Sequence, residues 1–584
     1  MKFPRRPALA FASLAATSAL LLAGCTSDTT DSSDSASGSD TTTSESSDSS
    51  TETVSSAVAE GEATYDDIDL PDVDLSPDAS SATEITLADG ASSGGDGVSV
   101  DGDTITITAA GTYVLSGELS DGQIVVDVAD GDVTLILDGV DITSDGAPAI
   151  TVDDADNLIL YTASGSTNYV SDTGTYDDTD EDTGGAAIYS TADLFLAGEG
   201  TLVVDAGRND GITSKDSLVI ASGTYEVSAA DDGIRGKDHL IILDGTVTVD
   251  ATGDALKSDN EADEDEPDRY VGIVWIAGGT IDLTAGTDGI DAANQVTIEG
   301  GDMTVDAGDD GIHSEVYLRI GDAEIDILNS YEGLEAAVIY LDSGAVSIVS
   351  SDDGINGSDG SGSSEMGGMG GGGGGMGGGP GSHGASDTSG SDDSTTAETA
   401  DYSTATDTTE TETVADDSTT VSVEVYISGG TYLIDADGDG LDSNGTITMT
   451  GGTVVISGPE DSGNGAIDYN GTFDIDGGTI AASGSSGMAE APDGGDQAVL
   501  GMTFGSSVTE GTVISVVDSD GELVMSFTTE KLSASLILSS AELESGETYT
   551  VYADGEVSGG EEVGPLTIGG TLSGGEELGT LTAS

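Results

Sequence analysis

The sequence predicts an all-β fold, a single-stranded parallel β-helix of about 22-residue coils that ends in a small C-terminal antiparallel β cap. A repeat with a fixed period, apolar residues at every second position, and the lack of sustained helical periodicity all indicate it. The acidic residue of a triplet, acidic, then Gly (Ala in one copy), then apolar, recurs at positions 210, 232 and 254, and again at 288, 310 and 332, in steps of 22 residues. Three short strands per repeat cannot enclose a core alone, whereas stacked repeats bury a continuous one.

Each repeat contains three apolar segments that we expect to be strands. The first is the Ile or Leu of the triplet, and the second is an alternating pair such as Leu240 and Ile242. The third is another alternating pair that follows a glycine, such as Val247 and Val249. Alternation bounded by Gly, Asp and Ser is typical of strands. We therefore expect ladders of Ile, Leu and Val inside the coils.

The N-terminus has the pattern of a bacterial secretory signal. Basic residues precede an apolar run from Ala8 to Ala23, which is too short to span a bilayer and ends in Leu-Ala-Gly-Cys25. Residues 1–25 are thus predicted to be a lipoprotein signal peptide with lipobox Cys25, the alternative being an ordinary signal peptide with an incidental cysteine. Diacylation of Cys25 would anchor a secreted protein at the outer face of the bacterial cytoplasmic membrane, or cell surface, and would be its sole membrane contact.

Composition divides the rest of the chain. Residues 26–64 are rich in Ser, Thr and acidic residues and are predicted to be a disordered linker. The predicted β-helix domain covers 65–494, with a disordered Gly/Met and Ser/Thr/Asp insertion at 358–420. The period is lost from about residue 495, so 495–584 are predicted to form the capping unit and C-terminal tail.

The charge of the chain restricts its partners. There are 112 Asp and Glu residues against 11 Lys and Arg, a formal net charge of −101. Nucleic acid and anionic lipid surfaces would be repelled and are excluded as direct partners. Such a surface either keeps the protein soluble or holds cations, and charge alone does not distinguish the two. We expect a monomer.

The acidic residues that open the triplets are candidate calcium ligands. Equivalent positions in neighbouring coils lie ~4.8 Å apart, where two carboxylates repel by roughly 3 kcal/mol at an effective dielectric constant near 20. Carboxylate and turn carbonyl oxygens are the ligands that Ca²⁺ prefers. The alternative is that each Asp only stabilises its own turn. The predicted metal ligands are Asp210, Asp232, Asp254, Asp288, Asp310, Asp353 and Asp439.

Basic residues outside the signal are few and concentrated, seven of the eight lying between positions 208 and 319. They either pair with the carboxylates or form a strip that, with calcium, meets an anionic ligand such as a uronic acid. The only tryptophan, Trp275, is expected to point outward, either to stack on sugar rings or to pack under the acidic excursion from Asp259 to Asp268. The candidate ligand-binding residues are Arg235, Lys237, Lys257, Lys215, Arg319 and Trp275.

Several segments resemble one known family. They are Asp231-Asp-Gly-Ile-Arg-Gly-Lys237, Gly253-Asp-Ala-Leu-Lys-Ser-Asp-Asn260, Gly111-Thr-Tyr-Val-Leu-Ser-Gly117, Gln123-Ile-Val-Val126 and the Gly/Met-rich insertion. The family consists of bacterial surface lipoproteins whose carbohydrate-binding domain is a right-handed parallel β-helix similar to polysaccharide lyases. The resemblance covers roughly residues 84 to 552. It implies right-handed coils, calcium binding, and binding of cellulosic material and acidic sugars without established catalysis.

The leading hypothesis is therefore a calcium-stabilised, non-catalytic, cell-surface protein that binds plant-type or uronate-containing polysaccharide. One alternative is a calcium-dependent polysaccharide lyase acting by β-elimination, with Lys237, Lys257 or Arg235 as the base. Neighbouring carboxylates raise the pKa of a lysine, which argues against that role, and no catalytic residue is assigned. Another alternative is a structural adhesin that shares calcium with its partner.

Overall fold

The computed structural model describes residues 61–173, 185–261, 270–359 and 422–584. Their strands form sheets of 34, six and two strands, with short 3-10 helices at η1 (Tyr65–Asp67) and η2 (Ala79–Ser81). No helix within these ranges is long and apolar enough to cross a bilayer. The predicted signal peptide with Cys25, the linker up to residue 60, and residues 360–420 of the predicted insertion lie outside the described residues.

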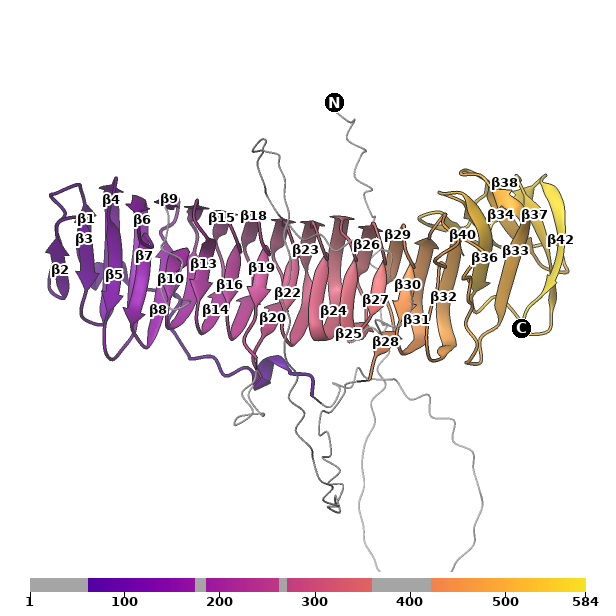
Figure 1. Cartoon of the computed structure of the whole chain (residues 1–584), viewed down its shortest axis with the longest axis horizontal. Helices are drawn as coiled ribbons and strands as arrows, with labels where there is room; N and C mark the ends of the chain where they lie inside the picture. Colours follow the sequence, from indigo (N-terminus) through magenta and orange to yellow (C-terminus); the bar gives the residue numbers. More distant parts are fainter. Residues whose placement is uncertain (1–60, 174–184, 262–269, 360–421) are drawn as a thin grey trace, which may run out of the picture. The chain divides into compact units, whose positions relative to one another are not determined.

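Strands of the large sheet pair mostly with the third strand after them. β10 (Ala186–Ser190) pairs in parallel with β13 (Asp210–Ser214), β13 with β16 (Ile234–Gly236), and β16 with β19 (Leu256–Ser258). The strands therefore stack in three rows around one core, and Figure 1 shows this stacking from β1 to β32.

Each row contains short strands, and longer strands pass from one row to the next. The first row also has β3 (Thr104–Ile107), β5 (Gln123–Asp127), β7 (Ile150–Asp154), β22 (Ile290–Ala292), β27 (Ile355–Gly357) and β30 (Leu441–Ser443). The second row has β1 (Thr83–Leu87), β8 (Asn157–Thr162), β11 (Asp193–Gly198), β14 (Ser217–Ile220), β17 (His239–Ile242), β20 (Ile273–Ile276) and β28 (Glu424–Ile427). The third row has β9 (Thr167–Thr173), β12 (Thr201–Ala206), β15 (Thr224–Ala229), β18 (Thr246–Ala251), β21 (Thr280–Thr284), β26 (Ala345–Ser350) and β29 (Thr431–Ala436). The longer strands are β4 (Gly111–Leu119), β6 (Val133–Asp145), β23 (Gln295–Asp306), β24 (Ile312–Asn329), β25 (Leu334–Leu341), β31 (Thr446–Ser457) and β32 (Phe473–Gly484).

Aligned apolar side chains fill the space between the rows. Ile212, Ile234, Leu256 and Ile290 are in register in the first row and have no exposed surface. β18 alternates exposed and buried residues along its whole length, as a strand with one wet face must. Full burial of one such side chain contributes about 1.5–3 kcal/mol, so the ladder is the main source of stability.

The structure corrects the predicted fold class, a right-handed single-stranded parallel β-helix with three short strands in each 22-residue coil. The large sheet instead closes around the core as a barrel-like wall of mainly parallel strands. β24 runs unbroken for 18 residues, and β2 (Val98–Asp101) pairs antiparallel with β3. The strand count was inferred from separate apolar segments, but strand pairing continues between them, as Gly300 and Gly301 opposite Asp322 and Ala323 show.

Antiparallel strands follow the last parallel strand at the C-terminal end, where the sequence predicted an antiparallel cap, and the first of them continue the large sheet. β36 (Ser533–Ser539) pairs with both β32 and β33 (Val499–Val508), so the last parallel strand does not leave an open edge. The six-stranded sheet consists of β34 (Val513–Val517), β35 (Leu523–Thr528), β37 (Thr548–Ala553), β39 (Glu561–Val563), β40 (Leu566–Ile568) and β42 (Glu576–Thr582). The two-stranded sheet consists of β38 (Glu556–Ser558) and β41 (Thr571–Ser573).

An N-terminal segment, residues 61–75, which we call the strap, covers the outer face of the second row. Its apolar residues, including Ala63 and Ile68, pack against Ile241 and Trp275 in a cluster separate from the main core. The side chain of Gln295 accepts a hydrogen bond from the Ala63 N–H at 2.8 Å and donates one to the Ala63 carbonyl at 3.0 Å. The strap therefore closes a face that the sheet alone would leave apolar.

Candidate functional site

A column of acidic residues runs along the first row at the positions that open the sequence triplets. We call it the acid column: Asp210, Asp232, Asp254, Asp288, Asp310, Glu332, Asp353 and Asp439. From Asp232 onward, one carboxylate oxygen commonly accepts the backbone N–H of the next member. The distances are 3.0 Å from Asp254 N to Asp232 Oδ1, 3.0 Å from Asp288 N to Asp254 Oδ1, and 2.9 Å from Asp310 N to Asp288 Oδ1. These acids thus bridge adjacent strands through one oxygen.

A second column lies three residues further along each strand of the row. We call it the flanking column: Thr213, Arg235, Lys257, Asp291, His313, Glu335, Asn356, Asp442 and Asp468. From Thr213 to Asp442 these residues pair in register across neighbouring strands, and the bridge between Leu441 and Ile467 extends the series. Each follows a buried Ile or Leu, so its side chain lies on the outer side of the sheet.

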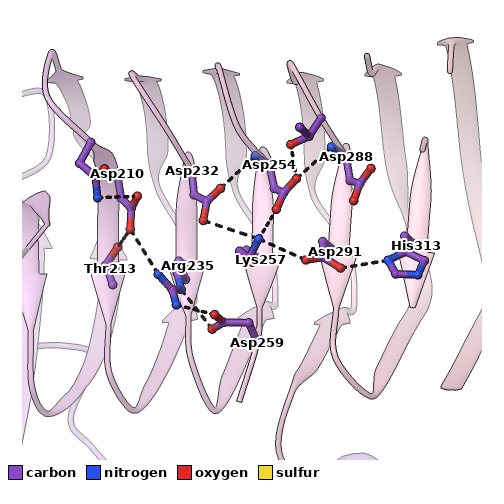
Figure 2. A network of polar contacts seen from close by, with 12 residues as sticks. Asp210, Thr213, Asp232, Arg235, Asp254, Lys257, Asp259, Asp288, Asp291 and His313 are labelled. Atoms are coloured by element: carbon purple, nitrogen blue, oxygen red, sulfur yellow. Dashed lines mark hydrogen bonds and ion pairs between the residues drawn. The ribbon is translucent and has the colours of Figure 1, made fainter. Parts of the chain in front are cut away.

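Basic side chains neutralise the first half of the two columns (Figure 2). Lys257 Nζ forms ion pairs with Asp254, with Asp291 at 3.3 Å and with Asp232 at 3.8 Å. Arg235 pairs with Asp259 and reaches Asp210 at 3.7 Å. Burial raises the pKa of Lys257's partner Asp232 to about 6 despite the lysine charge. The three acids at the start of the acid column, Asp210, Asp232 and Asp254, are therefore held by cations of the chain itself.

His313 marks the end of this basic half. Its Nδ1 lies 3.1 Å from Asp291 Oδ1, and its Nε2 lies 4.0 Å from Glu335 Oε2. Burial alone would lower the pKa of His313, but the hydrogen bond and charge of Asp291, aided by Glu335, raise it to about 9. The imidazole is therefore protonated at neutral pH and adds one more positive charge.

The second half of the columns is acidic apart from Asn356. In the described part of both columns, no basic residue follows His313. Burial, reinforced by the charge of Asp439, raises the pKa of Asp353 to about 8. Burial and the charge of Asp310 likewise raise the pKa of Glu332 to about 7. We call this half the carboxylate cluster: Glu332, Glu335, Asp353, Asn356, Asp439, Asp442 and Asp468.

Asn356 leaves a buried oxygen without a partner in the carboxylate cluster. Its Nδ2 donates to Glu332 Oε2 at 2.7 Å, whereas its Oδ1 accepts no hydrogen bond and the residue is only 7% exposed. Such an atom normally has a partner. Carboxylate oxygens lie within 4.8 Å of one another in two groups beside it, Asp310 with Glu332 and Glu335, and Asp439 with Asp442 and Asp468. Asp288, Asp291 and His313 form a third group of this kind.

The other predicted ligand residues lie away from these columns. Arg319, on the second row, is ion-paired with Glu62 and Asp342, and its guanidinium lies 4.1 Å from the centre of the Tyr340 ring. Trp275 points outward as expected, but it is 5% exposed and packs under the strap, with its ring centre 5.7 Å from that of Tyr65.

Lys215 and Lys237 are half-buried and hold equivalent positions just after β13 and β16. The structure thus brings Arg235 and Lys257 together with the acid column, but it does not bring Arg319 or Trp275 there. Sequence reasoning missed Asp291, His313 and the later flanking residues. Their constant offset of three residues from each triplet acid was the signal that could have found them.

Comparisons with known proteins identify the family of this chain. A family model described as carbohydrate-binding domain-containing protein matches residues 101–369. A protein of Acetivibrio thermocellus with the same description is 42% identical over 206 residues, covering 35% of this chain and 70% of that protein. The chain belongs to this family. The solved structure of the polysaccharide lyase-like protein from C. thermocellum, a gadolinium derivative, is 30% identical with a TM-score of 0.38, covering 42% of this chain and 96% of that one.

The matched region of this carbohydrate-binding domain-containing protein includes most of both columns. It contains the acid column from Asp210 to Asp353 and the flanking column from Thr213 to Asn356. Membership of a carbohydrate-binding family, predicted from sequence segments, is therefore confirmed. The lipid anchor at Cys25 and calcium binding remain predictions.

Proposed function

We propose that this carbohydrate-binding domain-containing protein is a calcium-stabilised, non-catalytic binder of plant-type or acidic, uronate-containing polysaccharide. Family membership supports the carbohydrate part of the proposal. The observation that carries the calcium part is the carboxylate cluster, in which several part-buried acids and one orphaned amide oxygen converge, with His313 beside Glu335 as the basic residue at its edge. Repelling carboxylates of this kind need protons or a bound cation.

The residues of the carboxylate cluster suit calcium. Ca²⁺ takes six to eight oxygen ligands in flexible geometry, and carboxylate and amide oxygens are among those it prefers. The ion would be held by Asp310, Glu332 and Glu335 with Asn356 Oδ1, and a second ion by Asp439, Asp442 and Asp468. Bound calcium would supply a positive charge for a sugar carboxylate or hydroxyl. Asp210, Asp232 and Asp254 already have Arg235 and Lys257 as charge partners and do not require the ion.

The protonation state of Lys257 supports a non-catalytic role. A lyase base must be neutral to take the proton next to the uronate carboxylate. Burial would favour a neutral Lys257, but its hydrogen bond to Asp254 and the charge of Asp232 outweigh burial and raise its pKa above the ordinary value. Arg235, held by Asp259, is even less suited to lose a proton. These two residues therefore serve as cations rather than as bases.

The site of action is proposed from the sequence. The lipobox at Cys25 supports secretion and lipid anchoring at the outer face of the bacterial cytoplasmic membrane or cell surface. The acidic stretch that follows would then hold the folded part away from the membrane. We propose that the protein acts there as a monomer.

The experiment measures calcium and polysaccharide binding separately on the full chain. Calcium is titrated calorimetrically after chelation, and retention on polygalacturonate and on cellulose is compared with and without calcium. Glu335→Gln with Asp442→Asn should weaken calcium binding by at least about tenfold, whereas the exposed Asp250→Asn on β18 should not. A chain that binds no polysaccharide would refute the carbohydrate function, and polysaccharide binding unaffected by chelation would refute the role of calcium.

A further inference from the structure

Three large apolar side chains are exposed where β24 and β26 end. Leu328 is 56% exposed, Tyr331 is 47% exposed and Val349 is 43% exposed. We call them the apolar lip. Exposed apolar groups that gather in one place, rather than singly, mark contact surfaces. The lip is therefore a candidate contact surface.

Leu328 lies on the outward side of β24 by the strand's alternation, and a β-bulge opposite β23 follows it. Val305 pairs with Ile327 and Asp306 with Asn329, so that Leu328 is the extra residue opposite β23. Ile327 also pairs with Ile348, the residue before Val349, and this register brings the exposed Leu328 and Val349 to adjacent positions of neighbouring strands.

Tyr331 joins the lip to the carboxylate cluster. Its N–H donates to the Asp309 carbonyl at 2.6 Å, and its own carbonyl accepts the Asp352 N–H at 2.9 Å. The next residue in the chain is Glu332 of the acid column. A hydrogen bond from the phenol to the Asp352 carboxylate, with that carboxylate's charge, raises the pKa of Tyr331 to about 12. The ring is thus neutral, anchored at its hydroxyl and exposed beside carboxylates.

We propose that Tyr331, supported by Leu328 and Val349, is the platform on which a pyranose ring of the polysaccharide stacks. This inference rests on the proposed function and adds where the sugar ring binds and which residue contacts it. The C–H face of a pyranose covers an aromatic ring and excludes water from it. Asp309 and Asp352, on either side of Tyr331 along the row, present carboxylates that accept hydrogen bonds from sugar hydroxyls. A uronate ring would in addition reach a cation in the carboxylate cluster.

The chemistry of the surroundings favours a sugar over an apolar protein partner. A hydroxyl-rich ring satisfies the acceptors around Tyr331, whereas an apolar protein surface would bury them without hydrogen bonds. A second copy of this chain would bring its own carboxylates against them, and a net charge of −101 opposes that association.

The test compares Tyr331→Ala and Tyr331→Phe with Tyr169→Ala. Tyr169 is the matched control, because it is 49% exposed and lies on β9, in the third row. Binding to polygalacturonate and to a neutral β-glucan is measured with and without calcium, together with calcium titration and sedimentation. Tyr331→Ala should weaken polysaccharide binding by about threefold to tenfold, with calcium binding and sedimentation unchanged. Tyr331→Phe should lose less, and Tyr169→Ala should lose nothing.

Comparison of the two polymers distinguishes an acidic from a neutral sugar ring. Comparison of the variants distinguishes failure of this assignment from failure of the proposed function. A loss confined to polygalacturonate with calcium identifies an acidic sugar, and a loss with both polymers identifies a sugar stacked regardless of charge. Wild-type binding by Tyr331→Ala, an equal loss in Tyr169→Ala, or a change in sedimentation in place of sugar binding would overturn this assignment alone. An unmutated chain that binds neither polymer would overturn the proposed function, and the stacking platform with it.

Discussion

Glu62 and Arg319 lie 257 positions apart in the sequence, yet their side chains form a bidentate ion pair, with Arg319 Nη2 donating to Glu62 Oε2 at 2.8 Å. The two side chains are 2% and 14% exposed. Asp342 also pairs with Arg319, so one guanidinium joins the strap to two adjacent strands of the second row. The pair fixes the point at which the strap meets the sheet.

We expect Arg319→Ala to loosen the strap. Removal of Arg319 takes the ion-pair partner away from the buried Glu62 carboxylate, which costs about 3 kcal/mol and corresponds to a roughly 100-fold larger population of the open strap. Hydrogen exchange of residues 61–75, followed by mass spectrometry, should rise by that factor. Glu62→Gln in the same chain should restore part of the protection, and unchanged exchange in Arg319→Ala would contradict the anchoring role.

Trp275 provides an optical measure of the strap, because it is the only tryptophan of the chain. Ile68→Asp places a charge in the apolar cluster over Trp275 and should detach the strap from it. The emission of Trp275 should then shift to longer wavelength as water reaches the indole. Asp66→Asn, at an exposed position of the same strap, is the control and should leave the spectrum unchanged.

Lys257→Met should make the stability of the basic half of the columns depend on an added cation. The substitution keeps the length of the side chain but leaves Asp232, Asp254 and Asp291 without their shared cation. In chelator, the unfolding temperature should fall, with a local cost of about 2 kcal/mol. Added calcium should recover more of the loss in this variant than in Lys237→Met. A variant as stable as the wild type in chelator would show that the network is not needed.

Without calcium, the unfolding temperature should fall as the pH rises from 5 to 8.5. Burial raises the folded pKa of Asp353 to about 8 and that of Glu332 to about 7, above the ordinary values of carboxyls. The folded chain therefore binds more protons than the unfolded chain, so stability is full below about pH 4 and is lost as the pH rises through the folded pKa values. We expect a decrease of roughly 5 °C by circular dichroism, smaller in Asp353→Asn and absent in saturating calcium. A stability that increases over this range would contradict the assignment.

The repeat predicted the features that depend on local pattern. The burial of Ile212, Ile234 and Leu256 and the register of Arg235 with Lys257 are confirmed. Both follow from a fixed period and from alternation, which a sequence displays directly. The continuous β24 did not follow, because apolar spacing does not reveal whether backbone pairing persists between apolar segments.

Non-local features were out of reach of the sequence pattern. The sequence around Glu62 does not indicate that Arg319 is its partner. The sequence around Trp275 does not indicate that residues from the N-terminal side cover it. The sequence predicted only part of the carboxylate cluster. Glu335 and Asp442 lie outside the triplet, and their surroundings are set by neighbours on other strands.

The side-chain hydrogen bonds along the acid column all run in the same direction. Each carboxylate from Asp232 to Asp310 accepts the N–H of the acid that follows it in the chain, so the acceptor is always synthesised before its donor. Each of these strands thus presents a carboxylate acceptor to the strand that follows it in the chain. We therefore expect the loss of one of these carboxylates to weaken the docking of the strand that follows it in the chain more than that of the strand before it.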